Sequence, residues 1–131
     1  MDNNVKIFIS VVSLLILGVI VTAVARSGGN GGPTIPGKYD AFTQCIKDKG
    51  AVFYGAFWCP HCQATKKLFG SSQKLLPYVE CSTPNGQAMI QQCIDKKIEG
   101  YPTWEFADGS RLTGEVALEK LAEKTSCELP Q

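Results

Sequence analysis

Hydrophobic positions are distributed in two different ways along the 131 residues of this chain. Ile7–Ala25 is an uncharged apolar run of 19 residues, close to the roughly 20 that span a bilayer as a helix. The small residues at 23–25 resemble the cleavage site of a signal peptide, but the apolar region of a signal peptide is shorter, about 7–15 residues. We therefore expect an uncleaved transmembrane helix, or signal anchor, in residues 1–25, with a cleaved signal as the alternative.

The next segment has no apolar periodicity. Residues 26–38 are rich in Gly and Pro, which is typical of a flexible linker. Residues 39–131 remain for one folded domain, which is long enough for a modest core. Its 10 Lys and Arg against 11 Asp and Glu give a net charge near −1. Nucleic-acid binding needs a basic surface, so we expect no nucleic-acid partner.

Within residues 39–131 the apolar spacing alternates between the period of a helix and that of a strand. The Asp-Gly pair at 108–109 predicts a hairpin turn. The pattern places Leu68 inward in one helix, and Ile90, Cys93 and Ile94 on one face of another. The predicted helices are 40–49, 59–69, 85–98 and 116–125, and the predicted strands are 51–57, 77–81, 103–107 and 110–113. This order predicts an α/β domain with a mixed four-stranded sheet and helices on both faces.

The strongest chemical signal is Cys59-Pro60-His61-Cys62, which follows a predicted strand and opens a predicted helix. The free N–H groups and the positive dipole end of a helix N-terminus stabilise a thiolate, and proline suits the first helical position. We expect Cys59, in the exposed first turn, to be the nucleophile and Cys62, more buried, to be the resolving thiol. His61 is expected to act through its charge or dipole, with an exposed bystander as the alternative. The motif predicts thiol–disulfide exchange.

Four further cysteines accompany the motif: Cys45, Cys81, Cys93 and Cys127. Cys81 ends a predicted strand and Cys93 faces inward from the next helix, so we predict a disulfide between them. Closing this loop of about 13 residues stabilises the fold by roughly 3 kcal/mol. Buried free thiols and an auxiliary redox pair are the alternatives. For Cys45 and Cys127, a bridge and two unpaired thiols are equally open.

The number of cysteines also bears on the compartment. Six cysteines in a small domain suit an oxidising environment rather than the cytosol. Together with the apolar segment, they predict a membrane-anchored domain on the extracytoplasmic side, in the cell envelope or periplasm.

Two motifs together resemble the thioredoxin fold. They are Trp58 with the following Cys-Pro-His-Cys at a strand–helix junction, and Tyr101-Pro102-Thr103 before the hairpin. The resemblance implies that the peptide bond before Pro102 is cis and that its loop faces the cysteine motif. The backbone of that loop would pair with an extended substrate peptide, so Trp58, Tyr101 and Thr103 are expected to bind substrate.

Longer stretches are similar to the thioredoxin-like partner domain of bacterial vitamin K epoxide reductase homologues. These are residues 54–63, 68–70, 77–82 and 100–105. The resemblance implies that the protein passes disulfides between cysteine-containing secreted or envelope proteins and a quinone-linked reductase in the membrane. The Pro-His pair between the cysteines is shared with the strongly oxidising DsbA type. Ordinary thioredoxins carry a buried acid six residues before the first cysteine, where this chain has Phe53, and this departure favours the oxidising direction.

We expect no metal, and no cofactor beyond a redox-active disulfide of Cys59 and Cys62. Three other interpretations remain open. A zinc site could use these two cysteines with Cys81 and Cys93, although zinc ribbons repeat the C-x-x-C spacing at both ends. A binding module could use the motif as a structural bridge only. Within the enzyme class, a reductase or isomerase of the cell envelope is the alternative to an oxidase.

Overall fold

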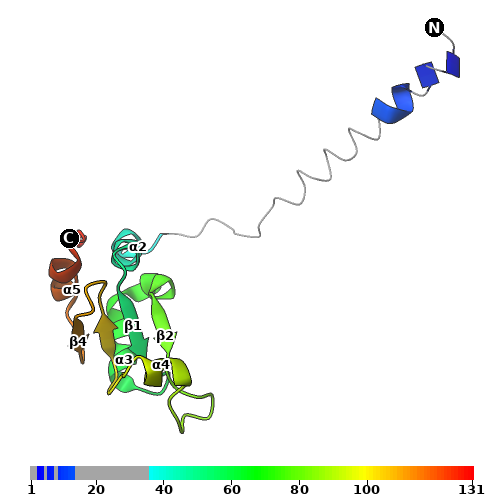
Figure 1. Cartoon of the computed structure of the whole chain (residues 1–131). Helices are drawn as coiled ribbons and strands as arrows, with labels where there is room; N and C mark the ends of the chain where they lie inside the picture. Colours follow the sequence, from blue (N-terminus) through cyan, green and yellow to red (C-terminus); the bar gives the residue numbers. More distant parts are fainter. Residues whose placement is uncertain (1–2, 5, 8, 14–35) are drawn as a thin grey trace. The chain divides into compact units, whose positions relative to one another are not determined.

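The computed structural model describes residues 3–4, 6–7, 9–13 and 36–131 (Figure 1). The first three ranges are helical, and Ile7, Ile9 and Val11 are exposed there. The rest of the predicted transmembrane helix, and the predicted linker up to residue 35, lie outside the described residues. Within the described ranges, no helix combines the length and the apolar character needed to cross a bilayer.

Residues 36–131 form one unit built around a mixed sheet. Its elements are α2 (Asp40–Asp48), β1 (Val52–Gly55), α3 (Pro60–Leu68), the 3-10 helix η1 (Gly70–Leu75), β2 (Tyr78–Glu80), α4 (Gln91–Asp95), β3 (Thr103–Glu105), β4 (Arg111–Thr113) and α5 (Leu118–Thr125). The strands are ordered β2-β1-β3-β4, with β1 parallel to β2 and the other neighbours antiparallel (Figure 1). The predicted α/β architecture with a mixed four-stranded sheet is confirmed.

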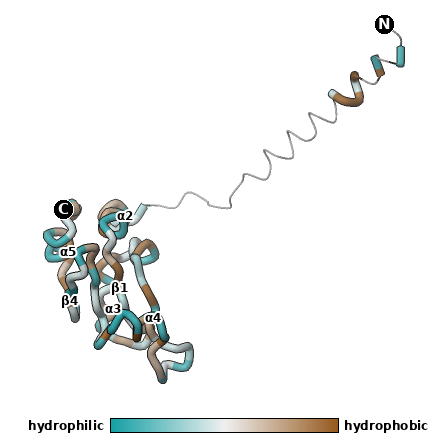
Figure 2. The backbone as a smooth tube through the Cα atoms, viewed as in Figure 1, coloured by the Kyte–Doolittle hydropathy of each residue, from teal (hydrophilic) through white to brown (hydrophobic). Residues whose placement is uncertain are grey.

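Helices cover both faces of the sheet, as predicted. Successive residues of β1 point to opposite sides, so each face of the sheet carries its own apolar cluster. Phe53 belongs to a larger cluster that includes Phe42 from α2 and Leu121 from α5. Tyr54 belongs to a smaller cluster with Cys93 from α4. Figure 2 shows β1 among the hydrophobic segments of the domain. The sheet therefore divides the core in two, and the C-x-x-C motif lies with the larger part.

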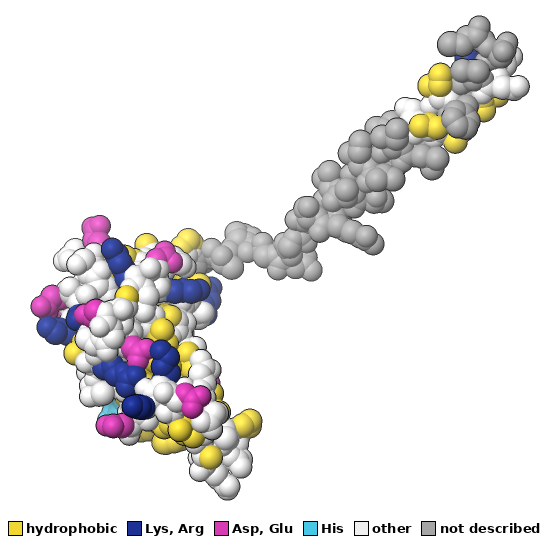
Figure 3. Space-filling model, viewed as in Figure 1, with side chains coloured by type: hydrophobic (Ala, Val, Ile, Leu, Met, Phe, Trp, Pro, Cys, Tyr) yellow, Lys and Arg dark blue, Asp and Glu magenta, His cyan; other side chains and the backbone are white. Residues whose placement is uncertain are grey.

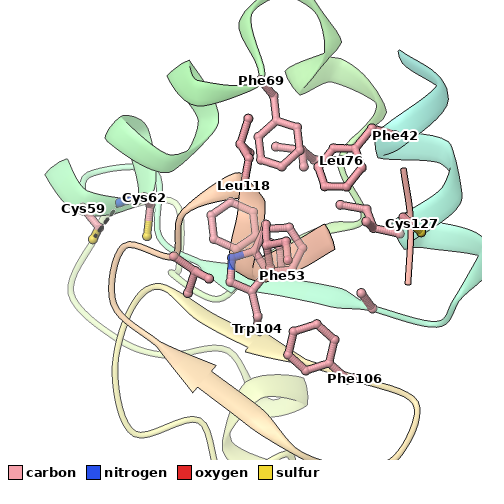
Figure 4. Close-up of a cluster of buried hydrophobic side chains, with 14 of the residues drawn as sticks. Phe42, Phe53, Cys59, Cys62, Phe69, Leu76, Trp104, Phe106, Leu118 and Cys127 are labelled. Carbon is pink, nitrogen blue, oxygen red and sulfur yellow. Dashed lines mark hydrogen bonds between the residues drawn. The ribbon is translucent and has the colours of Figure 1, made fainter. Parts of the chain in front are cut away.

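An aromatic stack fills the centre of the larger cluster (Figure 4). Phe53 stacks on Trp104 with ring centroids 4.8 Å apart and contacts Tyr78 at 5.4 Å. Phe69 adjoins Trp104 at 6.4 Å and stacks on Phe42 at 6.1 Å. Burying such a ring stabilises the fold by about 1.5–3 kcal/mol. Position 53, where ordinary thioredoxins carry an acid, is here part of the apolar core.

The third predicted helix is wrong over its first half. The prediction covered residues 85–98, whereas α4 covers only Gln91–Asp95. The preceding residues form a loop closed by a bridge between Ser82 and Met89. Within it, the Asn85 carboxamide oxygen accepts a hydrogen bond from the backbone two residues on, and Gly86 has a φ of 73°. This local turn competes with helix formation.

Two apolar side chains that were predicted to face the core are exposed. Leu68 is 45% exposed and Ile94 is 50% exposed. In α3 the buried positions are Cys62 and Thr65, and the next buried residue is the C-cap Phe69, so the inward stripe passes beside Leu68. In the short α4 only Cys93 is buried, because a single turn and a half has one inward position.

Two disulfides close the domain. Cys81–Cys93 forms as predicted and joins the residue after β2 to α4. Cys45–Cys127, which the sequence left open, joins α2 to the segment after α5. All six cysteines lie within the described residues, and the other two, Cys59 and Cys62, are free thiols. The thiols available for exchange are therefore those of the C-x-x-C motif.

Candidate active site

Cys59 caps the N-terminus of α3. Its backbone is extended, and its sulfur accepts a hydrogen bond from the backbone N–H of Cys62 at 3.4 Å (Figure 4). Pro60 follows at the first helical position, where no N–H is needed and the required φ is already set. The strand–helix junction thus places one sulfur on the free N–H groups of a helix, where negative charge is stabilised.

The loop with Pro102 lies beside this sulfur, as the resemblance implied. The Tyr101–Pro102 peptide bond is cis, and the Cys59 thiol lies 3.9 Å from the carbonyl oxygen of Tyr101. The Pro102 carbonyl accepts the backbone N–H of Gly114 at 2.9 Å, which ties the loop to the end of β4. The two predicted catalytic segments, 59–62 and the Pro102 loop, therefore meet at one place.

Cys59 is less exposed than predicted. It is 4% exposed, against 1% for Cys62, so the order of the two thiols is as predicted but neither lies on an open surface. The contact with Tyr101 accounts for this, since the loop covers the first turn of α3. A substrate disulfide must therefore reach Cys59 in the space beside the Tyr101–Pro102 loop.

Burial controls the chemistry of Cys62. Desolvation raises the pKa of its thiol to about 12, and the neighbouring Cys59 adds to the rise, against smaller lowering effects of the Ala56 backbone and Lys66. At neutral pH this thiol keeps its proton. Because only the thiolate attacks a disulfide, any resolving step by Cys62 needs a route for that proton.

Trp58 and Tyr101, two predicted substrate-binding residues, lie together at the rim of the site. Their rings meet edge to face with centroids 6.0 Å apart, and the Trp58 indole N–H donates to the Ser82 hydroxyl at 2.9 Å. Trp58 and its neighbour Phe57 are about half exposed. The aromatic rim is therefore fixed on one side by the loop that the Cys81–Cys93 disulfide closes.

Thr103, the third predicted substrate-binding residue, is buried. Its hydroxyl donates to the carbonyl of Gly100 at 2.8 Å, and its backbone belongs to β3. The Thr103 side chain therefore supports the Pro102 loop from within and does not line the surface, while substrate binding through the loop backbone stays a prediction.

His61 lies on the exposed side of α3 and is paired with a residue that the sequence analysis missed. Its Nδ1 is 2.6 Å from a carboxylate oxygen of Glu115, in the segment between β4 and α5. No spacing rule connects residues 54 positions apart, so the sequence holds no local signal for this pair. Where His61 is protonated, its positive charge is paired with the Glu115 carboxylate.

A polar network beneath Cys62 was also missed. The Tyr78 hydroxyl donates to Glu80 at 2.7 Å, and the other oxygen of the same carboxylate accepts the backbone N–H of Ser82 at 2.9 Å. The Lys66 ammonium group lies 3.4 Å from the centre of the Tyr78 ring. In the sequence, Glu80 is one polar residue in a short strand, and its partners depend on strand register.

The zinc alternative fails on its ligand set. Two of its four cysteines, Cys81 and Cys93, are bonded to each other. Among the residues that the structure describes, no three His, Cys, Asp or Glu side chains gather as metal ligands would. Charges of both signs are interspersed on the visible face of the domain (Figure 3).

Comparison with known proteins gives relatives that include the following two, while no family model matches the chain. It is 42% identical over 95 residues to "Thiol-disulfide oxidoreductase LTO1" of Arabidopsis thaliana, which covers 70% of this chain and 25% of that protein. It is 36% identical over 84 residues to "Thioredoxin domain-containing protein 5 homolog" of Drosophila melanogaster, which covers 55% of this chain and 19% of that protein. The matched region thus spans a quarter or less of either relative. Together with the mixed sheet, the cysteine motif and the facing cis-proline loop, these relatives support placing the chain in the thioredoxin-like superfamily.

Proposed function

We propose that this protein is a thiol–disulfide oxidoreductase in which Cys59 is the nucleophile and Cys62 the resolving thiol. The observation that carries the proposal is the position of the Cys59 sulfur. It lies between the N–H of Cys62 at the start of α3 and the carbonyl of Tyr101, while the four cysteines outside the motif are paired. A related Arabidopsis protein carries the name of this activity.

The oxidising cycle follows from this geometry. A substrate thiolate attacks Cys59 in the Cys59–Cys62 disulfide, the bond between the two cysteines breaks, and Cys62 leaves with the electron pair and takes a proton. A second substrate thiolate then attacks the substrate sulfur, which forms the substrate disulfide and releases Cys59 as a thiolate. The substrate loses two electrons and the Cys59–Cys62 pair gains them.

We propose the oxidising direction for two reasons. The helix N-terminus at Cys59 stabilises the thiolate, which makes Cys59 a better leaving group and its disulfide a stronger oxidant. In addition, position 53 holds a phenylalanine that packs against Trp104, in place of the acid of ordinary thioredoxins. Reduction or isomerisation of envelope disulfides is the opposite use of the same site.

The proposal also includes a membrane anchor and a membrane partner. The apolar run Ile7–Ala25 would hold the domain on the extracytoplasmic side, and a quinone-linked enzyme resembling the vitamin K epoxide reductase homologues would reoxidise Cys59–Cys62. Intact-mass analysis of the membrane fraction tests the anchor: we expect the apolar run to be retained. A soluble species that begins near Arg26 would overturn the anchor and leave the chemistry unaffected.

The activity and its direction are tested with a peptide that carries two reduced cysteines. The oxidised full chain is expected to convert the peptide to its disulfide stoichiometrically, with the peptide and the protein thiols counted by alkylation and mass spectrometry. Cys59→Ser is expected to produce no oxidation, because it removes the sulfur that the peptide attacks. If the wild-type chain leaves the peptide reduced, the oxidising direction is wrong. If the reduced chain also fails to reduce the disulfide form of the same peptide, the motif is a structural bridge and the proposed function is wrong.

A further inference from the structure

We propose that Tyr78 and Glu80 form the proton path of Cys62, in place of the buried acid that ordinary thioredoxins have at the position of Phe53. This inference rests on the proposed function, because it assigns the groups that move the proton in its two exchange steps. It concerns residues outside the C-x-x-C motif and outside the Pro102 loop.

Strand register brings the tyrosine under the resolving cysteine. In the parallel pairing of β1 with β2, Phe53 is opposite Tyr78 and Gly55 is opposite Glu80. Gly55 leaves open the space between the two reactive side chains, since a Cβ placed there would lie 2.9 Å from the Cys62 sulfur and 2.9 Å from Cε2 of Tyr78. The sulfur and the edge of the phenol ring therefore approach the same point.

The phenol is coupled to a carboxylate on its other side. The Tyr78 hydroxyl donates to Oε2 of Glu80 at 2.7 Å. Oε1 of the same group accepts the N–H of Ser82 at 2.9 Å, which fixes the carboxylate in place. Glu80 is half-buried, so it can exchange protons with solvent. The phenol hydroxyl thus leads from the ring edge beside the Cys62 sulfur to a carboxylate nearer the surface.

The surrounding groups favour a carrier role for the tyrosine. Burial, followed by the bond to Glu80, raises the pKa of Tyr78 well above its usual range, so the phenol stays protonated and can pass a proton without holding a charge. The other ionisable groups facing Cys62 or Tyr78 are Cys59, Lys66 and Tyr101. Cys59 is the reacting partner, and Lys66, over the Tyr78 ring, is a cation that cannot accept a proton.

Tyr101 also lies near these groups, and burial raises the pKa of its phenol, with smaller contributions from Glu80 and the two thiols. Tyr78 is the phenol whose ring edge approaches the Cys62 sulfur and whose hydroxyl is hydrogen-bonded to the carboxylate, which supplies the outer link of a proton relay. The geometry therefore selects Tyr78.

The path works in both directions of the cycle. When a mixed disulfide between Cys59 and a partner is resolved, the Cys62 thiol proton passes to the Tyr78 oxygen while the Tyr78 proton passes to Glu80. The Cys62 electron pair forms the bond to Cys59, and the bond from Cys59 to the partner breaks with its pair on the partner sulfur, which takes a proton from water. When a substrate thiolate opens the Cys59–Cys62 disulfide, the same path runs backwards and protonates Cys62 as it leaves.

The test follows the reduced full chain as it is oxidised by glutathione disulfide. At high oxidant concentration the formation of the Cys59–glutathione adduct becomes fast, and the observed rate reaches a plateau that reports resolution by Cys62. Acid quenching and mass spectrometry count the adduct and the product. The variants are Tyr78→Phe, which keeps the ring against Phe53, and Glu80→Gln, which keeps an acceptor for the tyrosine. Tyr54→Phe is the matched control, because it removes a phenol from the opposite face of the sheet.

Both variants are expected to accumulate the adduct and to lower the plateau rate at least about tenfold near neutral pH, in line with the usual contribution of a positioned acid or base. The deficit should shrink as the pH rises, because hydroxide then removes the proton. The double variant should be no slower than the slower single one, since the two groups form one path, and Tyr54→Phe should match the wild type.

Two results overturn the proton path. One is a plateau rate for both variants within about twofold of the wild type across the pH range. The other is an equal slowing of adduct formation and resolution at every pH, which indicates a structural role. If the wild-type chain forms no adduct at Cys59, the proposed function itself is wrong, and this outcome is distinct from the other two.

Discussion

Replacement of Cys62 by serine is expected to trap the protein in mixed disulfides with its partners, whereas replacement of Cys59 should abolish them. The reason is geometric. The Cys59 sulfur lies at the helix start beside the Tyr101 carbonyl, where an extended peptide can present a sulfur. Cys62 is 1% exposed and can act only on a bond that Cys59 has already formed. Non-reducing gels of the membrane fraction measure the adducts.

The identity of the trapped proteins tests the rest of the proposal. Mass spectrometry of the Cys62→Ser adducts should find secreted or envelope proteins with cysteines, and one integral membrane enzyme linked to quinone. Cytosolic proteins alone would contradict the predicted topology. Secreted proteins without a membrane oxidoreductase would remove the proposed partner and leave the exchange chemistry intact. Equal trapping by Cys59→Ser would contradict the assignment of the nucleophile.

Loss of the Cys45–Cys127 disulfide is expected to have the largest effect on stability. This bond joins residues 82 positions apart and ties α2 to the segment after α5. In the chain-entropy model a loop of this length contributes about 4–5 kcal/mol, against roughly 3 kcal/mol for the shorter loop closed by Cys81–Cys93. A small domain is stable by only about 5–15 kcal/mol, so the double variant Cys45→Ala/Cys127→Ala should lose about a third or more of its free energy of unfolding.

Urea titration of both double-alanine variants, followed by far-UV circular dichroism, measures this difference. The midpoint of Cys45→Ala/Cys127→Ala should fall further than that of Cys81→Ala/Cys93→Ala, although Cys81 and Cys93 are fully buried and Cys45 is only partly buried, so the comparison sets loop length against burial. A larger loss for the shorter loop would show that local packing around α4, and not loop length, decides the stabilisation.

The apolar pattern was sufficient for the strands, and the resemblance to the thioredoxin fold was sufficient for the meeting of the two motifs. Buried strands such as β1 are bounded by clear turn residues, and the cysteine motif fixes one strand–helix junction. The helix prediction failed at residues 85–90, because the apolar spacing there fits a helix while the turn at Asn85 and Gly86 prevents one. Leu68 was misplaced because it lies beside the inward stripe of Thr65 and Phe69, and the apolar spacing alone does not separate two adjacent apolar residues.

Local sequence patterns could not identify the groups that surround the cysteine motif. Tyr78 and Glu80 become relevant only once β2 is paired with β1 in the observed register. Glu115 reaches His61 because the segment after β4 returns to the start of α3. These contacts depend on tertiary structure, and residue type alone does not distinguish Glu80 or Glu115 from the other carboxylates of the domain.

The reduction potential of the Cys59–Cys62 pair tests the central proposal most directly. The full chain is equilibrated in glutathione buffers of graded ratio, and the thiols are alkylated and counted by peptide mapping. We expect one two-electron transition for Cys59 and Cys62 at a potential nearer the about −120 mV of DsbA than the about −270 mV of thioredoxin, while Cys45–Cys127 and Cys81–Cys93 stay oxidised. A potential below about −250 mV would contradict the oxidising direction. Cys59 and Cys62 that do not respond to the buffer ratio would contradict a redox function altogether.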